Sequence, residues 1–547
     1  TIGSGITEIG SNAFYSCQQL SGITCLATTP PTLGSDAFKW TNDCPIYVPC
    51  SAINAYRSVW GSYAGRITAI ETCPFDGKYL GIKSNYTTEY LACDSSTTLS
   101  GISKNNLISA EVGSCVTSIS ASTFQSCSSL SSVTINSGVT SIGQDAFRNC
   151  SAMTSIVIPD SVTSIGDYAF SWCTKLTSID ISNVTSVGTA MFYNCTSLRN
   201  VSMNSALSIG ASAFTYCNKI NRISAPSATS VGNSAFYDCS GLTSINLPSV
   251  TTVGSNAFNR CYYLQNITLP NATTIGSNAF SGCTYLYTLN LPSATAITSD
   301  AVSQCWNLRN VNLSRVTSIP DYMFARSGNN RFKLENIDIS SVTTIGNSAF
   351  RVCDKLTSIE LPDSLTSIGE YAFHYCSGMT SVTIGSGVTS IGNSAFQGCD
   401  ALESFTIWAT TPPTTTMNVL NHTNTYNIYV PCESVDAYKS ASGWSAYTTL
   451  IRPIPSTVKL LATYTDSSVS RVCCNDNPTL TRSEITSLQT TTAMTIADIG
   501  SCVTYIGESA FQSCSSLSSV TIPSSVTSIG VGAFNYCTSL SSITIPD

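Results

Sequence analysis

Charged side chains are scarce in this chain. Asp, Glu, Lys and Arg make up 10% of its 547 residues, and the net charge is −7. Nucleic-acid binding needs a concentrated basic surface, so this composition argues against a nucleic-acid partner. The two histidines, His374 and His422, have no cysteines or carboxylates at the spacing of metal ligands. We therefore expect no metal and no cofactor, and we expect His374, at a variable position after Phe373, to be exposed.

Long apolar runs are also missing. No stretch approaches the ~18 residues that cross a bilayer, and no basic and apolar leader opens the chain. A Gly-rich phosphate loop at a strand-to-helix junction is likewise missing. The segment from Thr1 to Ile6 has nearly the same sequence as residues 383–388, which lie in the middle of a repeat. We therefore expect a piece of a longer exported protein, with signal and anchor outside these residues and no membrane span within them.

The dominant feature present is a phrase of 22 or 23 residues that recurs sixteen times. In the copy that ends at Ile181, Leu176, Ile179 and Ile181 follow a Leu-x-x-Leu-x-Leu pattern, which predicts a strand facing a core. Ala169, Phe170 and Cys173 have the spacing of one helical turn. A fixed period of this length indicates a solenoid: an α/β repeat with a parallel β-sheet and short helical turns.

A cysteine follows the repeat's Phe by three residues in fifteen of the sixteen units, and only Ser327 departs. Equivalent positions on neighbouring rungs lie about 5 Å apart with parallel side chains, a poor geometry for disulfides. We expect these residues to be buried free thiols that pack as small apolar groups and donate weakly to nearby carbonyls. The ladder cysteines are Cys17, Cys127, Cys150, Cys173, Cys195, Cys217, Cys239, Cys261, Cys283, Cys305, Cys353, Cys376, Cys399, Cys514 and Cys537.

The phrase Val-Thr-Ser-Ile-Gly-x-x-Ala-Phe-x-x-Cys-x-x-Leu-Thr-Ser-Ile-x-Ile stands at Val162 to Ile181, and a close variant at Leu365 to Ile384. It resembles the BspA-like leucine-rich-repeat surface proteins of anaerobic gut and oral bacteria and of some mucosal protozoa. About three quarters of the chain carries the resemblance. It implies an exported, non-enzymatic adhesin or binding protein, extracellular or at the cell surface of an anaerobic microbe, and it assigns no catalytic residue.

Other segments occur twice and separate the repeat arrays. Ala-Thr-Thr-Pro-Pro-Thr and a later aromatic stretch follow the last rung of an array in both copies, which suggests a cap over its apolar end. The order that we expect is the end of a leucine-rich-repeat array at 1–24, a cap at 25–70, a β-rich connector at 71–113, an array of 13 units at 114–407, a second cap at 408–454, a second connector at 455–500, and the start of a further array at 501–547.

Two features of the caps and connectors leave alternatives open. Trp60 and Trp444 could serve as stacking platforms for sugars, although large aromatic residues are more often core. Cysteines outside the ladder could form one or two bridges. We favour free thiols, because a required disulfide would bring its partner into both copies, and three of these residues have no counterpart. The cysteines concerned are Cys44, Cys50, Cys73, Cys93, Cys115, Cys473, Cys474 and Cys502.

The outward column of the predicted sheet is the first candidate for binding. Most of its members are small and uncharged, and with rungs ~4.8 Å apart the thirteen strands make a face about 60 Å long. Its carboxylates, Asp180, Asp338 and Glu360, could approach one another across rungs, but nothing in the sequence shows a catalytic cleft. An aromatic and polar patch beside the column is the candidate ligand-binding site: Tyr262, Tyr263, Tyr285, Tyr287, Trp306, Arg309, Asn290 and Asn312.

Three functions fit these features. The first is an adhesin that presents the sheet and the aromatic patch to a host or matrix protein. The second is a self-assembling component of a surface or phage fibre, whose main partner is another copy. The third is a glycan-binding module on the same face. The paired Pro-Pro and Trp caps favour closure within one chain over end-to-end stacking.

Overall fold

The computed structural model describes residues 1–49, 52–69, 77–85, 87–93, 96–325, 332–415, 418–420, 426–474, 477–488 and 491–546. The chain divides into two compact units, Thr1–Leu286 and Tyr287–Asp547, and each is described by itself. Cys50, Cys73, His422 and Ser327, which the sequence analysis singled out, lie outside the described residues. No helix in the described part of the chain has the length and hydropathy of a membrane span.

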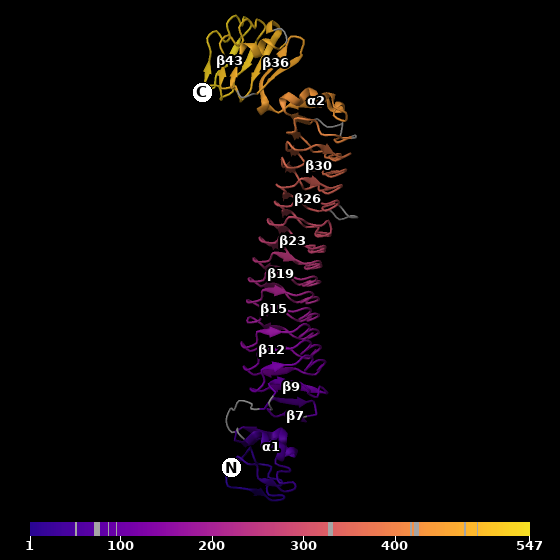
Figure 1. Ribbon diagram of the computed structural model, residues 1–547, viewed down its shortest axis with the longest axis vertical. Helices are drawn as coiled ribbons and strands as arrows, with labels where there is room; N and C mark the ends of the chain where they lie inside the picture. Colours follow the sequence, from indigo (N-terminus) through magenta and orange to yellow (C-terminus); the bar gives the residue numbers. More distant parts are fainter. Residues whose placement is uncertain are drawn as a thin grey trace. The chain divides into compact units, whose positions relative to one another are not determined.

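Each rung of the repeat carries two short parallel strands, so two ladders run along the array (Figure 1). In the predicted ladder, β14 (Ser178–Asp180) pairs with β16 (Asn200–Ser202), and Ile179 lies beside Val201. In a second ladder, β15 (Ser186–Val187) pairs in register with β17 (Ser208–Ile209). This second ladder was not predicted, because its strands are two residues long. The predicted fold class, a leucine-rich-repeat solenoid with parallel sheet, is confirmed.

The strands of the first unit's array are β8 (Thr98–Leu99), β9 (Leu107–Val112), β10 (Ser118–Ile119), β11 (Ser132–Ile135), β12 (Ser141–Ile142), β13 (Ser164–Ile165), β14 (Ser178–Asp180), β15 (Ser186–Val187), β16 (Asn200–Ser202), β17 (Ser208–Ile209), β18 (Arg222–Ser224), β19 (Ser230–Val231), β20 (Ser244–Asn246), β21 (Thr252–Val253), β22 (Asn266–Thr268) and β23 (Thr274–Ile275).

Those of the second unit's first array are β24 (Thr288–Asn290), β25 (Asn310–Asn312), β26 (Ser318–Ile319), β27 (Asn336–Asp338), β28 (Thr344–Ile345), β29 (Ser358–Leu361), β30 (Ser367–Ile368), β31 (Ser381–Ile384), β32 (Ser390–Ile391) and β33 (Ser404–Ile407).

The segment expected to be a short helix or helical turn is instead a succession of tight turns. Tyr168 and Trp172 have positive φ angles of 60° and 63°, which interrupts a helix every fourth residue. The N–H groups of Tyr168, Phe170 and Trp172 donate to carbonyls of the next rung, at 2.9, 3.0 and 2.7 Å. The backbone therefore satisfies its donors between rungs rather than within a helix.

A stack of phenylalanines fills the core beside these turns. From Phe124 to Phe280, ring centroids on successive rungs are 5.0 to 5.8 Å apart with nearly parallel planes. In the second unit the stack runs from Phe324 to Phe396 at 4.9 to 5.3 Å. Because each ring is buried only by its neighbours on adjacent rungs, the array is stable as a stack and not as single units.

The ladder cysteines are free thiols, as predicted, and most are buried. Most of these S–H groups donate to the Phe carbonyl of the preceding rung, as Cys195 does to Phe170 at 3.1 Å and Cys217 to Phe192 at 3.0 Å. Burial raises the pKa of Cys173 to about 12, against a backbone hydrogen bond that lowers it. These groups remain protonated donors at neutral pH and are poor nucleophiles.

Both cap segments continue the sheet and then add a short helix. The first comprises β2 (Ile23–Thr24), β4 (Ile46–Val48), α1 (Ile53–Val59), η2 (Gly61–Arg66) and β5 (Ile67–Ala69), with β1 (Glu8–Ile9) and β3 (Thr32–Leu33) in the other ladder. The second comprises β34 (Asn427–Val430), η3 (Cys432–Ser434), α2 (Val435–Ser440), η4 (Ser445–Tyr447) and β35 (Ile451–Pro453).

The cap tryptophans are buried, with 1% of Trp60 and none of Trp444 exposed. Their Nε1 atoms donate to the Pro31 and Pro413 carbonyls, each at 2.8 Å. A buried ring cannot stack against a sugar, so the sugar-platform alternative for these residues is wrong.

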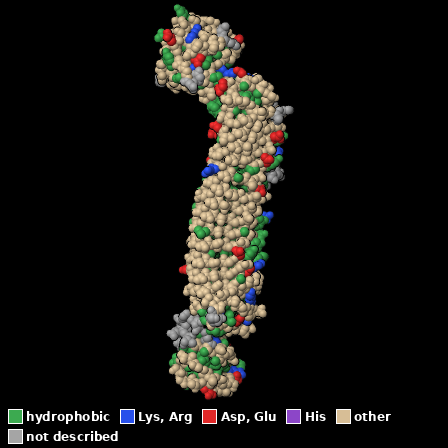
Figure 2. Space-filling model, viewed as in Figure 1, with side chains coloured by type: hydrophobic (Ala, Val, Ile, Leu, Met, Phe, Trp, Pro, Cys, Tyr) green, Lys and Arg blue, Asp and Glu red, His purple; other side chains and the backbone are tan. Residues whose placement is uncertain are grey.

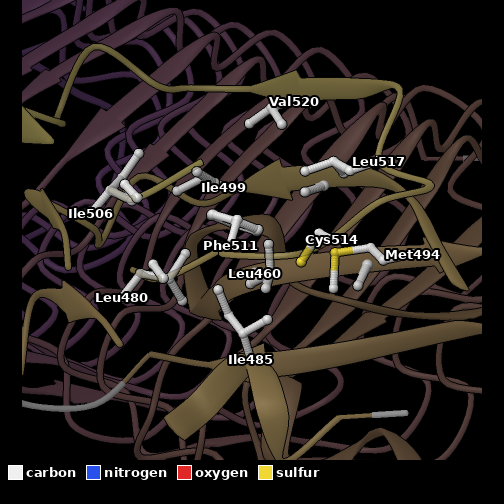
Figure 3. Packing of buried hydrophobic residues seen from close by; sticks show 14 of the residues in the cluster. Leu460, Leu480, Ile485, Met494, Ile499, Ile506, Phe511, Cys514, Leu517 and Val520 are labelled. Carbon is white, nitrogen blue, oxygen red and sulfur yellow. The ribbon is translucent and has the colours of Figure 1, made fainter. Parts of the chain in front are cut away.

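The connectors contain the antiparallel hairpins that the sequence predicted. In the second, β36 (Val458–Tyr464) lies between β37 (Val469–Cys473) and β39 (Met494–Ile499), and β39 continues in parallel with β41. Leu460, Ile485 and Phe511 meet in the core beneath (Figure 3). The remaining elements are β6 (Tyr79–Lys83) and β7 (Thr88–Leu91) in the first connector, and η5 (Pro455–Thr457), β38 (Thr479–Leu480), α3 (Arg482–Thr486), η6 (Thr491–Ala493), β40 (Tyr505–Ile506), β41 (Ser519–Thr521), β42 (Ser528–Ile529) and β43 (Ser542–Thr544).

Among the described residues, three disulfides link the connectors to neighbouring segments, which corrects the preference for free thiols there. Cys93 bonds Cys115 and Cys474 bonds Cys502, so this bridge occurs in both copies and joins each hairpin to the array that follows. A third bridge joins Cys432 in the second cap to Cys473. The repeat pattern does not predict these pairings, because they depend on how each hairpin folds against the following array and the preceding cap. Cys44 is free and buried.

Candidate binding surfaces

The outward side of the strand ladder carries small polar side chains. Asp180 pairs with Ser202 and Ser224 with Asn246, and all four face solvent. Asn246 Nδ2 donates to Ser224 Oγ at 3.1 Å, which ties two rungs together across this face. Because the apolar core is built from the inward residues, most outward residues can vary without changing the fold. This is the property expected of a recognition surface.

Two carboxylates on this face, those of Asp180 and Asp338, serve as turn acceptors. Asp180 Oδ1 accepts from the backbone N and the Oγ of Ser182, at 2.9 and 2.6 Å. Asp338 Oδ1 accepts from the backbone N of Ser340 at 3.1 Å. Each carboxylate fixes its own loop, as short acidic side chains commonly do. Their hydrogen bonds explain their presence without an acid–base pair.

A hollow of about 440 Å³ lies on the sheet side of the first unit. The strand ladder is interrupted here, because Ser155 makes only an isolated bridge with Ser178 and Val157 projects with 78% of its surface exposed. Asn183 Nδ2 donates to Asp160 Oδ1 at 3.2 Å at the same place. The lining combines an apolar side chain with polar groups, and it includes Ile156, Val157, Pro159, Asp160, Asp180 and Asn183.

The predicted aromatic patch is divided between the two units. In the first, Tyr263 and Tyr285 are 54% and 45% exposed, and their rings stack with centroids 5.3 Å apart. The backbone N of Tyr285 donates to the Tyr262 carbonyl at 3.1 Å, and the side chain of Tyr262 is half-buried. These contacts bring the three tyrosines together, and their role in ligand binding stays a prediction.

In the second unit, Trp306 packs edge-to-face against Phe332 with centroids 5.4 Å apart. Both residues line a hollow of about 330 Å³ with Tyr322 and Met323. Trp306 therefore contributes to a hollow that includes Phe332, a residue that the sequence analysis did not select.

The polar members of the patch have partners of their own. Arg309 Nη1 forms an ion pair with Glu335 Oε1 at 2.8 Å, and the backbone N of Arg309 donates to the Tyr287 carbonyl at 2.9 Å. Asn290 and Asn312 lie directly opposite each other on β24 and β25. Asn312 Oδ1 accepts from the backbone N of Ser314 at 3.1 Å.

Sequence reasoning missed a row of aromatic residues at the turns of the first unit. Trp172, Tyr193, Tyr216 and Tyr237 lie on successive rungs, with neighbouring ring centroids 6.1, 5.6 and 5.8 Å apart. We call these four residues the aromatic row. Its members alternate between the two positions that precede the ladder cysteine, so no single column of the repeat contains them all. The row could have been found by considering the aromatic residues at both of these repeat positions together.

His374 is buried, contrary to expectation, with 9% of its surface exposed. Its ring packs edge-to-face against Tyr371 and Tyr375, at centroid distances of 5.1 and 4.1 Å. The large rings of Tyr371 and Tyr375 cover His374, whereas small residues at their positions would leave it exposed. Among the residues that the structure describes, no group of three or more His, Cys, Asp or Glu side chains is arranged to hold a metal ion.

A family model described as "BspA type Leucine rich repeat region" matches residues 1–60, 102–221, 207–331, 328–441 and 456–547. Among solved structures, the chain is similar to a leucine-rich cell surface protein from Faecalibacterium prausnitzii, with 24% identity over 62% of this chain and 95% of that one, and a TM-score of 0.29. It is also similar to a leucine-rich repeat protein from Bacteroides ovatus, with 20% identity over 86% and 94% of the two chains and a TM-score of 0.25. A comparison with curated proteins gives no match.

Proposed function

Because the chain belongs to the BspA-type leucine-rich-repeat family, we propose that it is an exported cell-surface protein whose repeat arrays bind a host or matrix protein. The observation that supports this proposal is the separation of roles within each rung. Phe170 and Cys173 on one rung, and their equivalents on most other rungs, are buried in the core. The outward residues are free to form a binding surface.

We place the contact with the partner on exposed side chains of the array. The stacked pair Tyr263 and Tyr285 and the hollow beside Trp306 supply aromatic area with polar tips, which is what protein interfaces use. Asn290 and Asn312 supply amide donors and acceptors on the adjoining sheet.

Binding assays against immobilised host and matrix proteins test the proposal. We expect at least one of them to bind the whole chain, and Tyr285→Ala with Trp306→Ala to weaken that binding by about tenfold or more. Tyr15→Ala is the matched control, since Tyr15 is 46% exposed and lies outside the main array. A chain that binds none of these proteins would contradict the proposal.

Electron microscopy with mass photometry separates this function from self-assembly into a fibre. The caps favour single particles, because Trp60 and Trp444 are buried within their own chain. Regular filaments that persist on dilution would contradict the adhesin function and indicate a structural fibre protein instead.

A further inference from the structure

Two members of the aromatic row occupy backbone positions that disfavour aromatic residues. Trp172 and Tyr216 have φ angles of 63° and 65°, in the left-handed region where bulky side chains are rare. The equivalent residues on the alternating rungs are Asn194 and Asp238, at 58° and 54°. Asn and Asp adopt this conformation readily. The rings at Trp172 and Tyr216 are therefore present despite the backbone and not because of it.

The row is not needed to close the hydrophobic core. Phe170 and Cys173 fill the interior of the same rung completely, while Trp172 keeps 44% of its surface exposed. Residues in a disfavoured backbone conformation that are not required for the core occur often at functional sites. The second feature of this edge, its charge, indicates what kind of partner it fits.

Basic residues gather beside the row. We call the residues from two before to five after Cys150, Cys173, Cys195, Cys217, Cys239 and Cys261 the basic turn edge. It holds six cations and a single carboxylate, Asp238, in a chain whose net charge is −7. Figure 2 shows hydrophobic and basic side chains gathered along one edge of this part of the molecule. The cations are Arg148, Lys175, Arg199, Lys219, Arg222 and Arg260.

Four of these cations, Lys175, Arg199, Lys219 and Arg222, are exposed and make no ion pair with the described residues. The other two lie at the ends of the edge and pack on rings: Arg260 over Tyr237 and Arg148 over Tyr168, with 5.8 and 5.7 Å to the centroids. Arg148 also pairs with Asp145. The middle of the edge thus keeps unpaired positive charge next to aromatic area.

We infer that the basic turn edge, with its aromatic row, is the docking surface for an acidic segment of a partner protein. This inference rests on the proposed function, because it specifies which side of the array binds the partner and what chemistry the partner has. Trp, Tyr and Arg are the residues that dominate protein interfaces. Unpaired cations select and orient a partner that carries carboxylates.

A protein fits the row better than a glycan does. Tyr193 with Tyr216, and Tyr216 with Tyr237, pack edge-to-face at interplanar angles of 83° and 88°. Each such contact covers part of a ring face with the edge of its neighbour, which leaves little open face for sugars to stack on. The exposed edges and hydroxyl groups suit the mixed apolar and polar surface of a polypeptide.

Selection of a displayed library of random peptides on the whole chain tests the inference. We expect the enriched peptides to be rich in Asp and Glu and to bind less tightly at high salt. Trp172→Asn with Tyr216→Asn should weaken their binding by about tenfold or more. Replacing Lys175, Arg199, Lys219 and Arg222 together by Gln should do the same.

The controls separate binding from folding. Asn already occupies the equivalent position at Asn194, so the double Asn variant should keep or raise the melting temperature. Tyr536→Asn is the matched control, because Tyr536 has a φ of 60° and is 69% exposed on another array. It should leave peptide binding unchanged.

The outcomes distinguish this inference from the proposed function. Peptides that lose binding with Tyr285→Ala and Trp306→Ala, but not with the row variants, would overturn the inference and leave the proposed function standing. Enriched peptides without acidic residues, or binding that tolerates the Gln replacements, would also overturn it. If neither peptides nor host and matrix proteins bind, both proposals fail.

Discussion

At the scale of single residues, the repeat is defined by positions where only one kind of side chain fits. Gly166 is such a position, because an added Cβ would lie 2.4 Å from the backbone N of Gln144 on the preceding rung. The same close approach recurs at Gly143. Glycine here allows two backbones to stack.

Gly166→Ala should therefore destabilise the array by about 1–3 kcal/mol, because the two rungs must separate. Gly61→Ala is the control, since a Cβ at Gly61 meets nothing within 4 Å. Urea unfolding of both variants measures the difference. Equal unfolding midpoints would show that the rungs are not packed as closely as described.

His374 gives the fold a dependence on pH. Burial lowers its pKa, nearby Arg351 lowers it further, and a hydrogen bond with Gln397 raises it. Tyr371 and Tyr375 complete its surroundings. The unfolded chain therefore takes up a proton more readily than the folded one. Stability should be full above the ordinary His value of about 6.5 and should fall as the pH drops below it.

Thermal unfolding from about pH 8 to about pH 5 checks this expectation. His374→Gln should flatten the profile in that range, and Gln fits the position, since Gln397 occupies it one rung later. An equally steep loss in the Gln variant would assign the pH dependence to other groups.

At the scale of elements, the chain uses cysteine in two opposite ways. In the arrays, thiols such as Cys195 and Cys217 are buried and donate to carbonyls. In the connectors, bridges such as Cys474 with Cys502 join a hairpin to the next array. Position in the fold, and not cysteine content, decides which chemistry applies.

Alkylation of the native protein, read by mass spectrometry, should therefore label Cys17, which is exposed, and spare the buried ladder thiols. Mild reduction should add labels at the connector pairs and leave the arrays folded. The pairs are Cys93 with Cys115, Cys432 with Cys473, and Cys474 with Cys502. Rapid labelling of Cys195 or Cys217 without denaturant would contradict the buried ladder.

The caps offer a separate test. Trp444→Phe keeps the ring in the core but removes the 2.8 Å hydrogen bond to the Pro413 carbonyl. A buried acceptor without its donor costs about 1–3 kcal/mol, so the melting temperature should fall. Trp408→Phe is the control, since Trp408 is 38% exposed. An equal effect at both sites would argue against a capping role for Trp444.

The sequence predicted most of the core of the repeat, because periodic apolar residues such as Leu176 and Ile179 are committed to the interior. It could not predict the second ladder, whose strands, such as Ser164–Ile165, are only two residues long. Nor could it separate a helix from turns, since Phe170 and Cys173 have helical spacing in both. The aromatic row was not predicted from the sequence, because Trp172 and Tyr193 occupy different positions of the repeat.

At the scale of the whole molecule, the fold and the proposed recognition surface are encoded in separate residues. Inward positions repeat with little variation, whereas the basic turn edge differs from rung to rung and gathers charge opposite in sign to that of the chain. The proposed arrays, caps and connectors would then keep such surfaces in a fixed arrangement within each array. Partner choice can change without any change to the solenoid.

Hydrogen–deuterium exchange of the chain, with and without a selected acidic peptide, tests this account most directly. We predict slower exchange on binding in residues 171–178, 193–200 and 215–222, which belong to the basic turn edge. Exchange in residues 288–290 and 310–312 on the sheet face should not change. Protection of the sheet face alone would contradict the account and would return the binding site to the patch that the sequence first suggested.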